Sequence, residues 1–119
     1  MPAWTPNLEG RIIKAPKVFI NDTGLLCYLR GEGADSYLKN RSGAGPIFEN
    51  FVVMEIIKQL SWSDLALSPY HFRSHKGQEV DIVLENRKKQ LYGIEVKATS
   101  SVDYNDFKGL SYLQDLKPK

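Results

Sequence analysis

One alternating stretch constrains the fold of this chain more than any other, residues 78–98, which read QEVDIVLENRKKQLYGIEVKA. Apolar and polar residues largely alternate there, which predicts two strands, Gln78–Glu85 and Leu91–Ala98, joined by a short polar turn. Successive side chains of a strand point to opposite sides. One predicted face is wholly apolar and must pack on a core, and it holds Val80, Ile82, Leu84, Tyr92, Ile94, Val96 and Ala98.

The opposite face of this predicted hairpin carries charges. If the hairpin folds about Lys88, Asp81 lies opposite Glu95, and Glu79 lies opposite Lys97. Like charges in directly opposed positions destabilise a sheet. A simply solvated face is one interpretation. The other is that a divalent cation binds between the two carboxylates and turns their repulsion into a ligand set.

The remaining patterns predict helices and one more strand around the hairpin. The expected elements are an extended segment Lys17–Asp22, a short helix TGLLCYL with Asp22 or Thr23 as its cap, a turn of helix near Ser36–Lys39, a long helix from Pro46 to about Leu60, a strand YHFRSH and a last helix from Asp103 or Tyr104 to Leu116. This order predicts an α/β (α+β) fold. At 119 residues we expect one domain, residues 17–119, after an extended lead-in, residues 1–16.

Glu49 stands out in the long helix. On a helical wheel it projects between Ile56 and Leu60, on a face that should be buried. A buried carboxylate is normally matched by a partner or a metal. Glu49 could instead lie at the rim and complement the helix dipole. We expect it to point toward the hairpin acids.

Composition sets the broad class of the protein. No apolar run approaches the length that spans a bilayer, and Cys27 is the only cysteine, so we expect a cytoplasmic protein without a membrane segment. The net charge of +2 is too small to make the whole surface a nucleic-acid platform, so contacts to nucleic acid must come from local patches. The candidate residues for such a patch are Arg73, His75, Lys76 and Gln78.

The set Glu (helix), Asp and Glu-x-Lys resembles the active site of the PD-(D/E)XK nuclease superfamily, which includes restriction endonucleases. The wider text resembles one family, the uncharacterised C-terminal domain that follows the ATPase module in archaeal and bacterial AAA-type ATPases. The similar blocks, in order, are APKVFINDTGLLCYLRG, GPIFENFVVMEIIKQL, HFR, KGQEVDIVLEN, YGIEVKATSSV and DFKGLSYL.

This resemblance implies a restriction-endonuclease-like core, a mixed sheet with a central β-hairpin flanked by helices. It also implies roles for individual residues: Asp81 as the superfamily's aspartate, Glu95-Val96-Lys97 as its E-x-K and Glu49 as its first-helix acid. Asp81, Glu95 and the carbonyl of Val96 would hold Mg²⁺ or Mn²⁺, with Glu49 completing the shell directly or through water. Lys97 would orient the attacking water and balance charge. The implied function is DNA phosphodiester hydrolysis, an endonuclease activity.

Some features depart from the family pattern. Val80 stands at the proline of the "PD" signature, and no G-x-x-x-x-G-K-[ST] loop occurs, so the chain does not hydrolyse ATP on its own. The superfamily sheet usually gains a strand after the last helix, so we expect a domain truncated at its C-terminus. A missing strand would leave an edge that favours a homodimer or a partner such as an ATPase module. A non-catalytic DNA- or protein-docking module of an ATPase is the alternative function, and a structural domain with a solvated charged face is a third.

Overall fold

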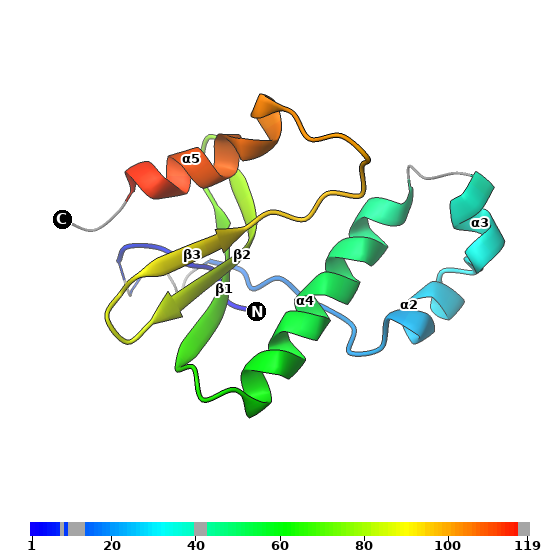
Figure 1. The fold of residues 1–119 in the computed structure, drawn as a ribbon, viewed down its shortest axis with the longest axis horizontal. Coiled ribbons are helices and arrows are strands. Elements are labelled where there is room, and N and C mark those ends of the chain that lie inside the picture. The colour runs from blue at the N-terminus through cyan, green and yellow to red at the C-terminus, as the bar shows by residue number, and fades with distance from the viewer. Residues whose placement is uncertain (8, 10–13, 40–42, 117–119) are drawn as a thin grey trace.

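The computed structural model describes residues 1–7, 9, 14–39 and 43–116 (Figure 1). Its elements, in chain order, are α2 (Thr23–Leu29), α3 (Ala34–Lys39), α4 (Ala44–Trp62), β1 (Leu67–Arg73), β2 (Glu79–Asn86), β3 (Leu91–Ile94), η2 (Tyr104–Phe107) and α5 (Lys108–Asp115). The α+β class is therefore confirmed. None of the helices in this described part of the chain is long and apolar enough to cross a membrane.

The sheet has the order β1-β2-β3 with antiparallel neighbours. The expected mixed sheet is not found in the described ranges: their one parallel pairing is an isolated bridge between Ala3 and His71. An isolated bridge forms because the chain near Ala3 runs beside β1 for too short a distance to make a ladder.

The hairpin has the register that the alternation predicts. Ile82 pairs with Ile94 and Val83 with Gly93, which centres the turn on Lys88. The Asn86 side chain accepts hydrogen bonds from the amides of Lys88 and Gln90, both at 2.9 Å, and so stabilises the turn. However, β3 ends at Ile94 rather than at Ala98, so Glu95 lies just past the ladder.

A register shift between β1 and β2 changes which side chains share a face. Tyr70 pairs with Val83 and Phe72 with Val80, so two residues of β2, Asp81 and Ile82, lie opposite one residue of β1. Such a bulge re-aims the side chains on either side of it. Val80 therefore packs in one cluster with Val83, and not with Ile82 as predicted.

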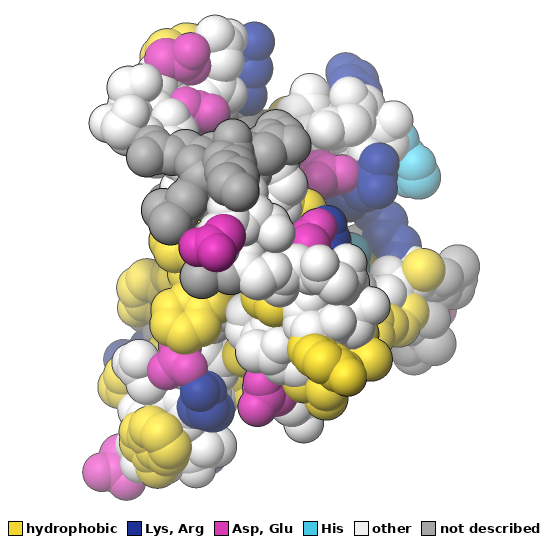
Figure 2. Space-filling view, turned by 90° about the vertical axis from the view of Figure 1, so that its right-hand side faces the viewer, with side chains coloured by type: hydrophobic (Ala, Val, Ile, Leu, Met, Phe, Trp, Pro, Cys, Tyr) yellow, Lys and Arg dark blue, Asp and Glu magenta, His cyan; other side chains and the backbone are white. Residues whose placement is uncertain are grey.

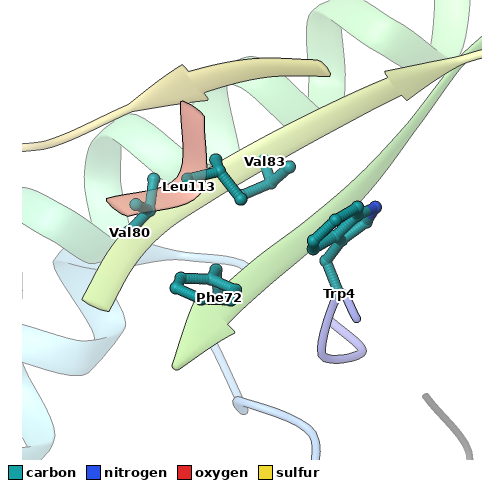
Figure 3. Close-up of a cluster of buried hydrophobic side chains, with 5 residues drawn as sticks. All are labelled: Trp4, Phe72, Val80, Val83 and Leu113. Atoms are coloured by element: carbon teal, nitrogen blue, oxygen red, sulfur yellow. The ribbon is translucent and has the colours of Figure 1, made fainter. Parts of the chain in front are cut away.

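Both faces of the sheet are covered as a result. On one face Ile82 and Leu84 pack against Val53 of α4, and on the other Val80 and Val83 pack against Leu113 of α5 (Figures 1 and 3). Two residues that we expected in the core, Tyr92 and Ala98, are exposed, because β3 is an edge strand that ends early.

The N-terminal residues complete the second cluster. Trp4 is only 1% exposed and packs with Phe72, their ring centroids 6.2 Å apart (Figure 3). Its backbone amide donates to the carbonyl of His71 at 2.7 Å. The first part of the expected lead-in is thus packed into the core. Burial of the large aromatic side chain of Trp4 stabilises this arrangement.

Glu85 of β2, which the alternation places on the charged face of the hairpin, is buried. Its carboxylate accepts hydrogen bonds from the indole of Trp4 at 2.7 Å and from the ammonium of Lys89 at 2.9 Å. A buried carboxylate needs such partners.

The C-terminal helical segment begins where the sequence predicts, but its first turn is the 3-10 helix η2, and α5 begins only at Lys108. The Asp103 side chain accepts from the Asn105 amide at 2.7 Å and forms a capping box with Asp106. Leu110 and Leu113 face the core, whereas Phe107, the last residue of η2, is exposed. Gly109 allows α5 to approach β2 so closely that a Cβ there would lie 1.8 Å from the carbonyl oxygen of Glu79.

This close approach predicts the effect of Gly109→Ala. In an open helix position the change would stabilise the protein by about 0.5–1 kcal/mol. Here the methyl group meets backbone, so we expect the free energy of unfolding to fall by about 1–3 kcal/mol. Urea unfolding followed by circular dichroism measures it. Ser111→Ala, at an exposed position of the same helix, should stay within about 0.5 kcal/mol of wild type. A Gly109→Ala protein as stable as wild type would contradict the close packing.

Candidate active site

A buried asparagine of α4 fixes the segment that precedes α2. The Asn50 side chain accepts from the amide of Ile20 at 2.9 Å, and donates to the carbonyl of Ile20 at 2.9 Å and to the hydroxyl of Thr23 at 3.1 Å. The backbone of Lys17 exchanges two hydrogen bonds with Met1, at 2.8 and 2.9 Å. The segment is extended but is not a strand, and these bonds hold Lys17 beside α4 and β2.

Lys17 links two of the expected site acids. Its ammonium forms a short ion pair with the Glu49 carboxylate, and it lies 3.7 Å from Oδ1 of Asp81. The side chains of Lys17, Glu49 and Asp81 are 35%, 21% and 13% exposed. Glu49 therefore points from α4 toward the hairpin, with a lysine between it and Asp81.

Asp81 also holds the chain beyond β3. Its second oxygen, Oδ2, accepts a hydrogen bond from the amide of Val96 at 2.9 Å. The bulge places Asp81 where its side chain can reach that amide. Val96, whose carbonyl group was the expected ligand, thus contacts Asp81 through its N–H group.

Glu95 is the most unusual acid of the group. Oε1 lies 3.1 Å from the Lys97 ammonium, while Oε2 is buried and has no hydrogen-bond partner within the described ranges. Burial raises the pKa of Glu95 above its ordinary value, and the charge of Asp81 adds to this rise, whereas the hydrogen bond from Lys97 opposes it. The carboxylate is therefore incompletely neutralised.

Lys97 is charged and held between two acids. Its hydrogen bond with Glu95, together with the charge of Asp106 at 3.8 Å, raises its pKa above the ordinary value. Such a lysine is a fixed positive charge that can stabilise negative charge developing nearby.

The site thus contains two adjoining lysine–carboxylate groups, one around Lys17 and one around Lys97. In the part of the chain that the structure describes, no three Asp, Glu, His or Cys side chains form a cluster that could hold a metal ion. Glu49, Asp81 and Glu95 would have to rearrange around Lys17 to act as one ligand set.

The donor types nevertheless suit a hard divalent cation, which prefers carboxylate oxygens. The buried Oε2 of Glu95 without a partner is the kind of atom that a cation would satisfy. Residues able to hold the ion are Asp81 and Glu95, with Glu49 available once Lys17 moves.

The expected nucleic-acid residues lie around one end of the β1–β2 pair. Arg73 and His75 line a cleft of about 480 Å³ that Asp81 and Lys17 also line. Arg73 is exposed and pairs with Glu79 at 2.9 Å. Lys76 lines a separate pocket, and Gln78 is hydrogen-bonded to Ser74 instead of facing the cleft.

Three residues of the site could not be found from local patterns. Lys14 and Lys17 follow no periodicity, and Asn50 reads as an ordinary polar residue on a helix. Lys14 also lines the cleft and donates to the carbonyl of Arg73 at 2.7 Å. The one pattern that could have pointed to these lysines is their spacing. Lys14 and Lys17 are the only charged residues between positions 14 and 21.

The raised pKa of Glu95 predicts a pH dependence of stability. The folded state binds this proton more tightly than the unfolded state, whose pKa is near 4.5. Protonation of Glu95 therefore contributes fully to the free energy of unfolding below that pH. This contribution is lost as pH rises through the pKa of Glu95 in the folded state. Glu95→Gln keeps the shape and removes this loss, so its stability relative to wild type should increase as pH rises from below 4.5 through the folded pKa of Glu95. Urea unfolding across this range measures the difference.

Lys97→Met serves as the matched variant for this measurement. Because Lys97 lowers the pKa of Glu95, its removal should move the loss of stability to higher pH. Parallel profiles for wild type and Glu95→Gln would show that Glu95 is not perturbed.

Similarity to known proteins extends over most of the chain. "Uncharacterized protein Mb2031c" of Mycobacterium bovis and "Uncharacterized protein Rv2008c" of Mycobacterium tuberculosis are each 32% identical over 98 residues, covering 82% of this chain and 21% of the relative. The chain thus spans about a fifth of the length of these relatives. No solved structure matches it. Residues 44–119 match the family described as a domain of unknown function, DUF4143, and the chain therefore belongs to the DUF4143 family.

Proposed function

We propose that this domain is a divalent-metal-dependent nuclease that hydrolyses phosphodiester bonds of DNA. The observation that carries the proposal is Glu95: a partly buried carboxylate beside Asp81 and Lys97, with one buried oxygen that has no hydrogen-bond partner among the described residues. A folded protein keeps such a group at a cost in stability. That cost is understandable if the group binds a cation.

The resemblance to the PD-(D/E)XK superfamily supports the same function. Asp81, Glu95 and Lys97 match its signature in order and spacing. Asp81 and Glu95 influence each other electrostatically, and Lys97 contacts Glu95. The helix acid, Glu49, is linked to Asp81 through Lys17, which contacts both carboxylates.

Each residue has a chemical task in this proposal. Asp81 and Glu95 hold the ion, and the bond from Asp81 to the Val96 amide fixes the distance between β2 and the segment that carries Glu95 and Lys97. A bound Mg²⁺ or Mn²⁺ would supply Lewis-acid catalysis at the phosphate. Lys97 would orient water and stabilise the negative charge that develops as the bond to phosphorus breaks.

The adjoining cleft suits a phosphate chain. Lys14 and Arg73 line the same cleft as Asp81. Nucleic-acid backbones bind to such lysine and arginine side chains. A strand in the cleft would therefore bring a phosphate next to Asp81.

A docking module is the second candidate, and the surface of α2 and α4 favours it. Leu25 and Tyr28 of α2, with Phe48 and Phe51 of α4, are exposed apolar side chains. Figure 2 shows hydrophobic side chains reaching the surface in several groups on the face that it presents. Since the relatives are about four times as long as this chain, an ATPase module elsewhere in such a protein could cover them.

The nuclease proposal is tested by cleavage of plasmid and branched DNA with Mg²⁺ or Mn²⁺. Asp81→Asn removes a ligand charge, yet its amide oxygen can still accept from the Val96 amide. Lys97→Met removes the positive charge. We expect each change to lower the cleavage rate by about 100-fold or more.

Glu55→Gln is the control, since Glu55 pairs with Lys58 at a partly exposed position of α4 outside the candidate site. It should cleave at the wild-type rate. If wild type cleaves none of these substrates with either metal, the nuclease proposal is wrong and the docking module becomes the better account.

A further inference from the structure

Lys17 lies where the carboxylates of the candidate site converge. Its ammonium contacts Glu49 and lies 3.7 Å from Oδ1 of Asp81. The other oxygen of Asp81 is committed to the Val96 amide. The oxygen of Asp81 that remains for a cation is therefore the one that faces Lys17.

We propose that Lys17 is a built-in counter-cation of this acidic site, which a divalent ion must displace in order to bind Asp81 and Glu49. The inference rests on the proposed function, because it concerns the metal site of that function. It adds a residue that competes with the ion and so sets the concentration at which the site fills.

Electrostatics makes the two cations alternatives. An ammonium and a divalent ion within about 4 Å of the same carboxylate repel each other strongly in a partly buried site. The Lys17 side chain also screens the two acids from each other while no ion is bound. The domain can thus keep its acids together without a metal, but it binds the metal less tightly than two free acids would.

The surroundings of Lys17 allow this exchange. Its backbone is fixed by the two bonds to Met1, and the following segment is fixed by Asn50. The side chain, in contrast, is partly exposed and lines the cleft next to Asp81. A displaced ammonium can therefore turn into the cleft without any change of fold.

The test is direct binding of Mn²⁺ to the whole chain, followed by electron paramagnetic resonance of the free ion. Lys17→Met keeps the length of the side chain and removes the charge, so we expect Mn²⁺ to bind about tenfold more tightly than to wild type. Lys17→Arg keeps the charge and should stay close to wild type. Lys58→Met removes a lysine that pairs with Glu55 elsewhere on α4, and it should also bind like wild type.

The melting temperature of Lys17→Met is a second measurement. Without metal, Lys17→Met should melt below wild type, because Glu49 and Asp81 lose the cation between them. Added Mn²⁺ should then raise the melting temperature of Lys17→Met more than that of wild type. Circular dichroism of the variant establishes that it is folded.

The outcomes separate this inference from the proposed function. If Mn²⁺ binds wild type and binding is lost in Asp81→Asn, but Lys17→Met binds no more tightly than wild type, the role of Lys17 is wrong and the metal site stands. If neither wild type nor Lys17→Met binds Mn²⁺, both proposals are wrong.

Discussion

The hydrogen bond between the Asp81 carboxylate and the Val96 amide is the contact on which the candidate site depends. The backbone ladder of the hairpin stops at Ile94, and this side chain continues it for two further residues. It does so because the bulge opposite His71 turns Asp81 out of the regular alternation. The segment with Glu95 and Lys97 lies past the end of the β2–β3 ladder, so this side-chain hydrogen bond is what links it to β2.

Charge balance explains the rest of the arrangement. A half-buried cluster of Glu49, Asp81 and Glu95 would be unstable without cations, and the fold supplies two lysines from different parts of the chain. Lys97 comes from the same hairpin as Glu95, whereas Lys17 arrives from the segment bound by Asn50. The balance is incomplete at Oε2 of Glu95, and this remaining negative potential is the property that a cation site requires.

The sequence predicted what depends on local periodicity and missed what depends on distant contacts. The hairpin register about Lys88 and the cap of α2 at Asp22 follow from neighbouring residues and are confirmed, and Asp103 is a cap as predicted, although it caps η2, which leads into α5. The bulge at Asp81 could not be predicted, because the apolar run Ile82-Val83-Leu84 interrupts the alternation without marking an extra residue, and only the pairing with β1 reveals it. Trp4 and Lys17 were missed for the same reason: they reach Glu85 and Asp81 across 81 and 64 positions of sequence, and no local pattern records such contacts.

These distant contacts also show which part of the chain makes one physical unit. The DUF4143 match begins at residue 44, yet Trp4 packs in the core cluster on the α5 face of the sheet, and Lys17 lies between Glu49 and Asp81. Residues before the matched region thus contribute both to the packing and to the electrostatics of the site. A fragment limited to residues 44–119 would leave Val83 and Phe72 without their aromatic neighbour and Glu49 without its counter-charge. The two losses would act in opposite directions on a metal site, because the first loosens the sheet that positions Asp81 and the second removes the cation that competes for it. The packing of the core and the charge balance of the candidate site therefore both depend on the same N-terminal segment.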